Sequence, residues 1–136
     1  MFFTSNDGQE PADYPDFAHA VSAHVANQDS DFGILVCNSG VGMSIAANRH
    51  KNIRAALCHN QDYVKLARQH NDANILCIGA KFTDAANAEA IVKAFLQSNF
   101  DKAARHLKRV ESQEVVLSTK LQNACLQDVL RMDTRV

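Results

Sequence analysis

The chain has 136 residues, of which 46% are apolar and 21% are charged, and its formal net charge is −1. This length and apolar content fit one globular domain over residues 1–136, and the near-neutral charge disfavours a nucleic-acid partner. No run approaches the roughly 18 apolar residues that span a bilayer, so we expect a soluble, cytoplasmic protein without a membrane partner.

Strand and helix patterns alternate along the chain as far as Phe100. Short apolar runs rich in β-branched residues predict buried strands, and apolar residues at helical spacing predict helices. In chain order we predict a helix over residues 13–27, a strand over 32–37, a helix over 41–50, a strand over 53–58, a helix over 60–71, a strand over 73–80 and a helix over 84–99. Continuous apolar strands that alternate with helices are typical of a parallel sheet covered on both faces. We therefore predict an α/β, doubly wound, Rossmann-like fold with three layers.

Individual residues add detail to two of the predicted helices. Asp13 is available as the N-terminal cap of the first helix. In the helix over residues 60–71, Tyr63, Leu66 and Ala67 share one apolar face of the kind that packs on a sheet.

Beyond Phe100 the alternation of strands and helices stops. A basic cluster follows, and residues 112–131 predict a further helix with an apolar stripe. Because this stripe lies beyond the sheet, we expect the C-terminal helical extension, residues 110–136, to pack on another subunit.

The four cysteines, Cys37, Cys58, Cys77 and Cys125, form no CxxC pair and do not have the spacing of a zinc site. We therefore expect no bound metal. Three of them lie in short apolar runs, where a free cysteine is most often a small buried apolar residue. Only Cys37 has neighbours that suggest chemistry.

The sequence Cys-Asn-Ser-Gly-Val-Gly over residues 37–42 lies where a predicted strand meets a predicted helix. Ligands of α/β folds bind at the carboxyl ends of the strands, and Gly40 and Gly42 let the backbone approach an anion closely. A thiolate is favoured beside a helix N-terminus, which makes Cys37 a candidate base or nucleophile. The alternative is a tight turn with a buried cysteine at its edge.

Two further groups are candidates for binding or catalysis. The RQHNDAN segment places His70 and Asn71 between a helix and a strand, and we expect them at the same sheet edge as Cys37, facing one cleft. The alternative is a capped helix end. Arg105 and Arg109 are four residues apart on one helical face, which suits a phosphate dianion, although a solvated basic face is the alternative.

Together these groups carry a resemblance to a known family. The segments CNSGVGMSIAANRHKNIRAALCH, RQHNDAN and ARHLKRVE occur in order after a DYPDFA segment. They resemble the successive signatures of type B ribose-5-phosphate isomerases, of the ribose/galactose isomerase superfamily, over residues 11 to about 111. The resemblance implies a Rossmann-like sheet, a homodimer or homotetramer, a phosphorylated sugar as ligand, and neither a metal nor another cofactor.

By position, the resemblance implies that Cys37 removes the proton from C2 of the open-chain sugar and passes it to C1 through a cis-enediolate. His70 resembles the acid/base group that helps to open the furanose ring. Ser39 stands where the family commonly has threonine, which keeps a hydroxyl near the ring oxygen. An anion hole for the enediolate oxygen is implied for the backbone amides of Asn38, Ser39, Gly40, Val41 and Gly42.

The remaining binding residues follow in the same way. Asn71 resembles the residue that holds sugar hydroxyls, and Arg105 and Arg109 resemble a phosphate clamp that is completed across the dimer interface. Lys81 stands where many members carry arginine, so a point charge replaces a forked contact. Asn38 replaces a usual glycine, and asparagine tolerates a left-handed conformation better than most residues.

The family's first β-α unit, roughly 30 residues with an Asp-His pair, has no counterpart in this sequence. Because that strand is central to the family's sheet, we expect a neighbouring strand with unpaired backbone groups and uncovered apolar surface. A start codon assigned too far downstream is the favoured explanation, and a truncated gene or a fold covered by dimerisation are the alternatives.

We therefore predict an aldose-ketose isomerase that interconverts ribose 5-phosphate and ribulose 5-phosphate in the pentose phosphate pathway. One alternative is an isomerase of a six-carbon sugar phosphate, such as allose or galactose 6-phosphate, with the same base. Another is an inactive relic of the family that binds a phosphosugar without converting it.

Overall fold

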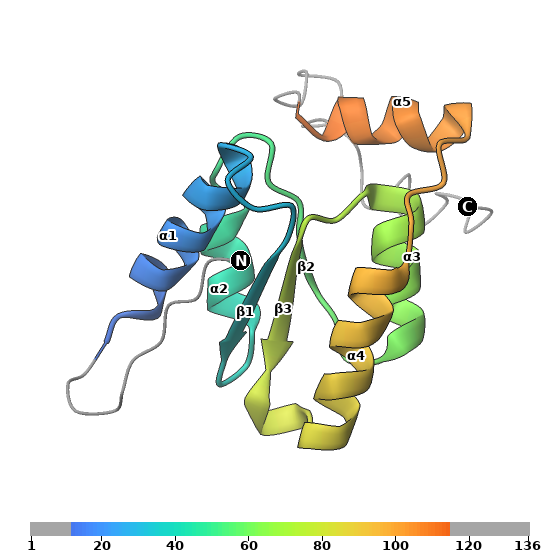
Figure 1. The fold of residues 1–136 in the computed structure, drawn as a ribbon. Coiled ribbons are helices and arrows are strands. Elements are labelled where there is room, and N and C mark those ends of the chain that lie inside the picture. Colours follow the sequence, from blue (N-terminus) through green and yellow to red (C-terminus); the bar gives the residue numbers. More distant parts are fainter. Residues whose placement is uncertain (1–11, 115–136) are drawn as a thin grey trace, which may run out of the picture.

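A computed structural model describes residues 12–114 of the chain, and Figure 1 shows their arrangement. In chain order the elements are α1 (Tyr14–Ala26), β1 (Gly33–Cys37), α2 (Val41–Ala47), β2 (Ala55–Leu57), α3 (Gln61–Asn71), β3 (Ile75–Gly79), the 3-10 helix η1 (Ala80–Phe82), α4 (Ala85–Gln97) and α5 (Ala104–Gln113). Every strand and helix predicted before Phe100 is therefore present, with somewhat shorter bounds. No helix within residues 12–114 has the length and apolar character needed to cross a membrane.

The strands form one parallel sheet in the order β1-β3-β2. In the central strand β3, Ile75 pairs with Gly33 of β1 and with Ala55 of β2, so all strands begin at one edge of the sheet, the amino edge. At the opposite edge, the carboxyl edge, Cys37 pairs with Gly79. The predicted α/β class with a parallel sheet is confirmed.

Helices cover the sheet on two faces and give the predicted three layers (Figure 1). Side chains alternate along β3, because successive residues of a strand point to opposite faces. Ile75 and Cys77 pack with residues of α1 and α2, whereas Leu76 and Ile78 pack with residues of α3 and α4. All residues of β3 are buried, which explains its continuous apolar sequence.

β1 is less covered than a strand buried on both faces. Among the described residues its one neighbour is β3, and Ile34 and Val36 are exposed while Leu35 is buried. The apolar cluster beneath α3 and α4 includes residues of β3 and β2 but none of β1. The prediction of burial on both faces therefore holds for β3 and is wrong for β1, which instead shows the expected uncovered apolar surface.

The buried face of α3 also differs from the prediction. Tyr63 and Leu66 are 59% and 51% exposed, and of the predicted face only Ala67 is buried. α3 buries Val64, Ala67 and Arg68 instead. Both faces satisfy helical spacing. The observed face is buried because Val64 packs in the core and because backbone carbonyls accept hydrogen bonds from Arg68.

Side chains cap α3 and α4 but not α1. Asp13 occupies the predicted cap position of α1, but its side chain makes no capping hydrogen bond. In contrast, the side chains of Asn60 and Asp84 accept hydrogen bonds from backbone amides in the first turns of α3 and α4. Such caps satisfy amides that have no partner within the helix.

α5 follows the sheet and crosses above the amino edge, close to the end of α3 (Figure 1). It places Arg105 and Arg109 in a helix, as their spacing predicted. Most of the helix predicted over residues 112–131 lies outside the described residues, so that helix and its packing on a partner stay predictions.

Candidate active site

The thiol of Cys37 lies at the carboxyl edge, where β1 ends and a tight loop leads into α2. The backbone amide of Gly40 donates a hydrogen bond to the Cys37 sulfur, at 3.1 Å. Gly40 has a φ of +77°, and a Cβ at this position would lie 2.5 Å from Leu57 Cδ1, so the loop requires glycine there. Asn38 does not have a positive φ, so it needs no left-handed conformation.

The end of β3 supports this loop from below. Gly79 approaches it so closely that a Cβ would lie 2.5 Å from the carbonyl oxygen of Ser39. Lys81 in η1 donates its backbone N–H to the carbonyl of Asn38 at 3.0 Å. The structure therefore brings Asn38, Ser39 and Lys81 together with Cys37 at the carboxyl edge.

Two of the amides expected to form an anion hole already have acceptors. Gly40 donates to the Cys37 sulfur, and Val41 donates to the hydroxyl oxygen of Ser39 at 3.3 Å. A hydrogen bond donated to sulfur stabilises a thiolate more than a neutral thiol. The amide of Gly40 is therefore placed to activate the thiol, and the remaining amides of residues 38–42 are the candidates for holding an oxyanion.

Tyr14 lies beside the first turn of α2, a position that its helical spacing alone does not indicate. A Cβ at Gly42 would lie 2.6 Å from the Tyr14 hydroxyl oxygen. The signal that could have found it is the DYPDFA segment, which sets this tyrosine at the start of α1 directly before a proline. Tyr14 therefore places a phenol against the first turn of α2.

Burial separates Cys37 from the two cysteines of the core. It raises the pKa of Cys58 to about 11 and the pKa of Cys77 to about 12. Both thiols therefore stay protonated near neutral pH, as expected of small buried apolar residues. Cys37 is only partly buried and is the candidate for thiolate chemistry among the three.

His70 and Asn71 lie at the amino edge, because they end α3 just before β3 begins at Ile75. Cys37 lies beside Gly79, at the other end of β3. Four strand steps of ~3.3 Å separate the two edges by about 13 Å. The prediction that His70 shares a cleft with Cys37 is therefore wrong within one chain. A helix that precedes a parallel strand ends at the amino edge, whereas a loop that follows a strand lies at the carboxyl edge.

α5 places a second histidine and basic side chains next to His70. The rings of His70 and His106 are stacked, with centroids 4.3 Å apart and an interplanar angle of 13°. Nε of Arg105 donates to Nε2 of His106 at 3.3 Å. Arg109 lies one turn further along α5. The amino edge thus gathers the predicted acid/base group and the predicted phosphate clamp.

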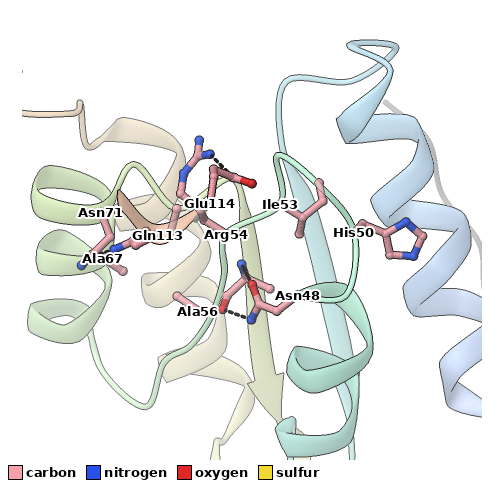
Figure 2. Close-up of a pocket in the computed structure, with 11 residues that line it drawn as sticks. Asn48, His50, Ile53, Arg54, Ala56, Ala67, Asn71, Gln113 and Glu114 are labelled. Atoms are coloured by element: carbon pink, nitrogen blue, oxygen red, sulfur yellow. Dashed lines mark hydrogen bonds and ion pairs between the residues drawn. The ribbon is translucent and has the colours of Figure 1, made fainter. Parts of the chain in front are cut away.

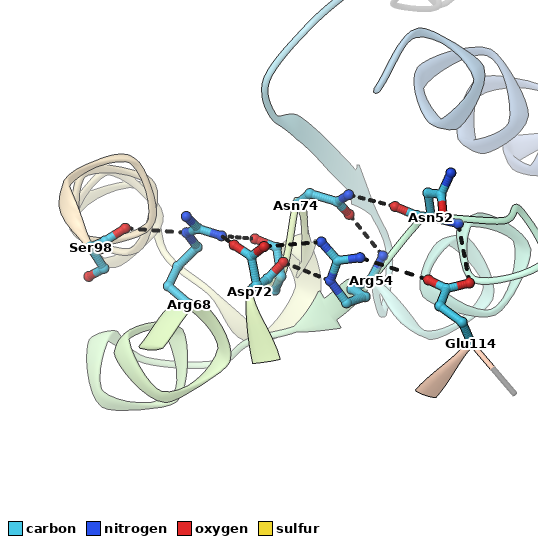
Figure 3. Close-up of polar contacts among 8 residues, drawn as sticks. Asn52, Arg54, Arg68, Asp72, Asn74, Ser98 and Glu114 are labelled. Carbon is cyan, nitrogen blue, oxygen red and sulfur yellow. Dashed lines mark hydrogen bonds and ion pairs between the residues drawn. The ribbon is translucent and has the colours of Figure 1, made fainter. Parts of the chain in front are cut away.

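A network of charged side chains fixes the end of α3 (Figure 3). Asp72 takes a left-handed conformation with a φ of 46°, which ends the helix. Its carboxylate contacts Arg54 at 3.3 Å and Arg68 at 2.9 Å. The side-chain oxygen of Asn74 accepts from the Arg54 amide at 2.8 Å. Three residues of the RQHNDAN segment, Arg68, Asp72 and Asn74, therefore hold the fold together, and the histidine and asparagine between Arg68 and Asp72 are left for chemistry.

A cavity of about 410 Å³ opens at the amino edge (Figure 2). Asn71 lines it, and its side-chain oxygen accepts a hydrogen bond from Gln113 at 3.0 Å. Arg54 and Glu114 lie on the same wall, 3.8 Å apart. Cys37 is not among the lining residues, so this cavity does not contain the thiol.

The candidate residues thus fall into two groups at opposite edges of the sheet. The thiol half-site comprises Cys37, Ser39, Lys81 and the loop amides, and the histidine half-site comprises His70, Asn71, Arg105 and Arg109. Within residues 12–114, no three His, Cys, Asp or Glu side chains are grouped so as to hold a metal ion. The thiol, imidazole and guanidinium groups of the two half-sites can transfer protons and bind anions.

Comparisons with known proteins agree on one family. The family model described as Ribose/Galactose Isomerase matches residues 2–112. The ribose-5-phosphate isomerase B of Escherichia coli (strain K12) is 43% identical over 103 residues, which are 76% of this chain and 68% of that protein. The type B ribose 5-phosphate isomerase structure of Trypanosoma brucei has a TM-score of 0.81 at 44% identity, covering 83% of this chain and 76% of that chain. The corresponding structure from Thermotoga maritima has a TM-score of 0.79 at 45% identity, covering 82% and 77%.

Proposed function

The chain belongs to the ribose/galactose isomerase family and is a sugar-phosphate isomerase, and from this premise we propose that its substrates are ribose 5-phosphate and ribulose 5-phosphate. The observation that carries the proposal is the partly exposed Cys37 thiol, whose sulfur accepts a hydrogen bond from the Gly40 amide at the carboxyl edge. The reaction would serve the pentose phosphate pathway. The cytoplasmic location and the single domain expected from the sequence stay predictions.

In the proposed reaction, the Cys37 thiolate removes the proton from C2 of the open-chain aldose. The electron pair of the broken C–H bond forms a double bond between C1 and C2, and the carbonyl oxygen at C1 takes the negative charge of a cis-enediolate. The remaining loop amides and the Ser39 hydroxyl donate to the enediolate oxygens. A proton moves between the oxygens and the thiol returns its proton to C1, so no electrons leave the substrate and no redox partner is needed.

The proposed site is shared by two copies of the chain. Cys37 and His70 lie at opposite edges of one sheet, too far apart to act on one five-carbon sugar. A second copy that sets its amino edge against the carboxyl edge of the first brings the two half-sites together. His70 then helps to open the furanose ring, Asn71 binds sugar hydroxyls, and Arg105 and Arg109 bind the phosphate. This arrangement needs at least two copies of the chain, and we propose a homodimer or homotetramer.

The test is a coupled assay of ribulose 5-phosphate formation with the full chain and with a Cys37→Ser variant. We expect the wild type to be active, and we expect the variant to lose about 100-fold or more in kcat, because a hydroxyl is a far weaker base than a thiolate. In D2O, the product should contain solvent deuterium at C1, since the thiol exchanges its proton.

Cys58→Ala is the matched control, because Cys58 is buried in the apolar cluster beneath α3 and α4, whereas Cys37 packs against the other cluster. The substitution should leave kcat unchanged apart from a small loss of stability. Allose 6-phosphate, assayed in parallel, tests substrate length. Full activity of Cys37→Ser would refute the role of the thiol, and a preference for the six-carbon substrate would refute the proposed substrate.

A further inference from the structure

His106 is a fully buried polar side chain that the proposed reaction does not use. One face of its ring stacks on His70, and Nε2 at its edge accepts from Nε of Arg105. We infer that His106 is a positioning residue that holds the acid/base ring of His70 and the phosphate-binding guanidinium of Arg105 in one fixed arrangement. The inference rests on the proposed function, because it acts through two residues to which that function gives roles.

The hydrogen bond from Arg105 defines the tautomer of His106. Because Nε2 accepts from Arg105, the ring proton of the neutral imidazole is on Nδ1. Burial lowers the pKa of His106, its interactions with His70, Arg105 and Arg109 lower it further, and only the Asp101 carboxylate opposes them. Oδ2 of Asp101 lies 3.5 Å from Nε2 of His106. A neutral ring can accept from Arg105, whereas a protonated ring would repel it.

Packing alone does not explain a histidine at this position. Within residues 12–114, Nδ1 of His106 has no hydrogen-bond partner although it is buried. An unsatisfied buried N–H destabilises the fold, and a phenylalanine would fill a similar space without one. The imidazole therefore destabilises the fold, and its contacts with Arg105 and His70 explain why a histidine stands at this position.

Each contact leaves the functional atoms of the neighbouring residue available. The bond to Nε of Arg105 orients the guanidinium and leaves its two terminal nitrogens for a forked contact with phosphate. The stack covers one face of His70 and leaves the nitrogens at the ring edge outside the contact. One buried side chain thus sets the distance between the proton-transfer group and the phosphate clamp.

Two variants separate the two contacts. His106→Phe keeps a ring to stack on His70 but removes the acceptor for Arg105, so KM for the sugar phosphate and Ki for inorganic phosphate should rise about 5-fold or more with kcat within about 2-fold. His106→Gln keeps an oxygen acceptor near the place of Nε2 but removes the stacked ring, so kcat should fall about 5-fold or more with Ki for phosphate nearly unchanged.

The free energy of unfolding distinguishes a positioning role from a structural one. If His106 only stabilised the fold, His106→Phe would be less stable than the wild type. In urea unfolding, His106→Phe should be as stable as the wild type or more stable, while its phosphate binding is weaker. Equal losses of stability and activity in both variants, or no change of Ki in His106→Phe, would overturn the inference.

The wild-type chain supplies an independent test. Nitrogen NMR of labelled histidine should show His106 protonated at Nδ1 and unprotonated at Nε2. A proton on Nε2 would remove the bond to Arg105 and with it the inference. If the wild type converts no sugar phosphate, the proposed function fails by itself, and the tautomer together with the Kd for inorganic phosphate of the wild type and both variants still decides whether His106 positions Arg105.

Discussion

The sulfur of Cys37 receives an amide hydrogen bond at the open edge of the sheet, while the sulfurs of Cys58 and Cys77 lie in the apolar core. A thiol becomes a base only as a thiolate, and burial disfavours that charged form. The pKa values of Cys58 and Cys77, raised to about 11 and about 12, leave almost no thiolate at pH 8. Reactivity is thereby confined to the one of these three thiols that a substrate can reach.

Alkylation with iodoacetamide at pH 8 should therefore modify Cys37 first. We expect the peptide with Cys37 to be labelled in the native protein, and the peptides with Cys58 and Cys77 to be labelled only after unfolding in urea, as measured by mass spectrometry. The raised pKa values also set the sign of the pH dependence of stability. Both core thiols ionise at a higher pH in the folded chain than in the unfolded chain, so the free energy of unfolding falls as the pH rises above 9 towards 12. Labelling of all three thiols at equal native rates would contradict this assignment.

At the scale of elements, ion pairs and hydrogen bonds at the end of α3 link the segments of the amino edge. Asp72 caps the helix and bridges Arg54, which directly precedes β2, to Arg68, whose side chain is only 7% exposed. Arg68 also donates to the Ala73 and Ser98 carbonyls, so its charge is surrounded by acceptors from two loops. A buried guanidinium depends on such partners, because its hydration is lost on folding.

Replacement of Asp72 by asparagine should lower the free energy of unfolding by about 1 to 3 kcal/mol, because Arg68 loses its carboxylate while the left-handed conformation remains accessible. Urea unfolding measures the change. Glu89→Gln is the matched control: Glu89 pairs with Lys93 on the exposed surface of α4, and its loss should change stability by less than about 0.5 kcal/mol. Equal effects of the two substitutions on the free energy of unfolding would show that the Asp72 network does not stabilise the amino edge.

The elements themselves could be read from the sequence, because apolar runs of strand length and helical spacings depend on local chemistry. The buried face of α3 could not, since the spacing of Tyr63 and Leu66 is as helical as that of Val64 and Arg68, and only the sheet beneath decides between them. The motif around Gly40 was enough to predict a tight loop that needs glycine. The placement of His70 could not be predicted without the order and direction of the strands.

At the scale of the whole molecule, the opposite placement of the two half-sites is the main consequence of the parallel sheet. Loops after β1 and β3 meet at the carboxyl edge, and the end of α3 and α5 meet at the amino edge (Figure 1). A parallel sheet cannot fold one edge onto the other, so cooperation between Cys37 and His70 requires a second chain.

Subunit mixing tests this directly. Cys37→Ala and His70→Ala chains should each be nearly inactive alone, and refolding them together in equal amounts should restore about a quarter of the wild-type activity, because half of the dimers are mixed and each has one intact site. Sedimentation or light scattering checks that the mixed sample is dimeric.

The matched control mixes His70→Ala with Arg105→Ala, which damage the same half-site, so that each shared site in a mixed dimer still has a defective histidine half-site. No activity should return in that mixture. Recovery in the control, or none in the first mixture, would contradict a site built from opposite edges.

The proposed sharing of each site between two chains also determines how a damaged allele would behave beside an intact one. A chain with a single lesion in either group still completes one site in every mixed pair, so total turnover falls in proportion to the intact fraction. A chain with both lesions spoils each site it enters, and turnover then falls with the square of that fraction. The dominance of a damaged allele over an intact one would thus depend on whether that allele carries one of the two lesions or both.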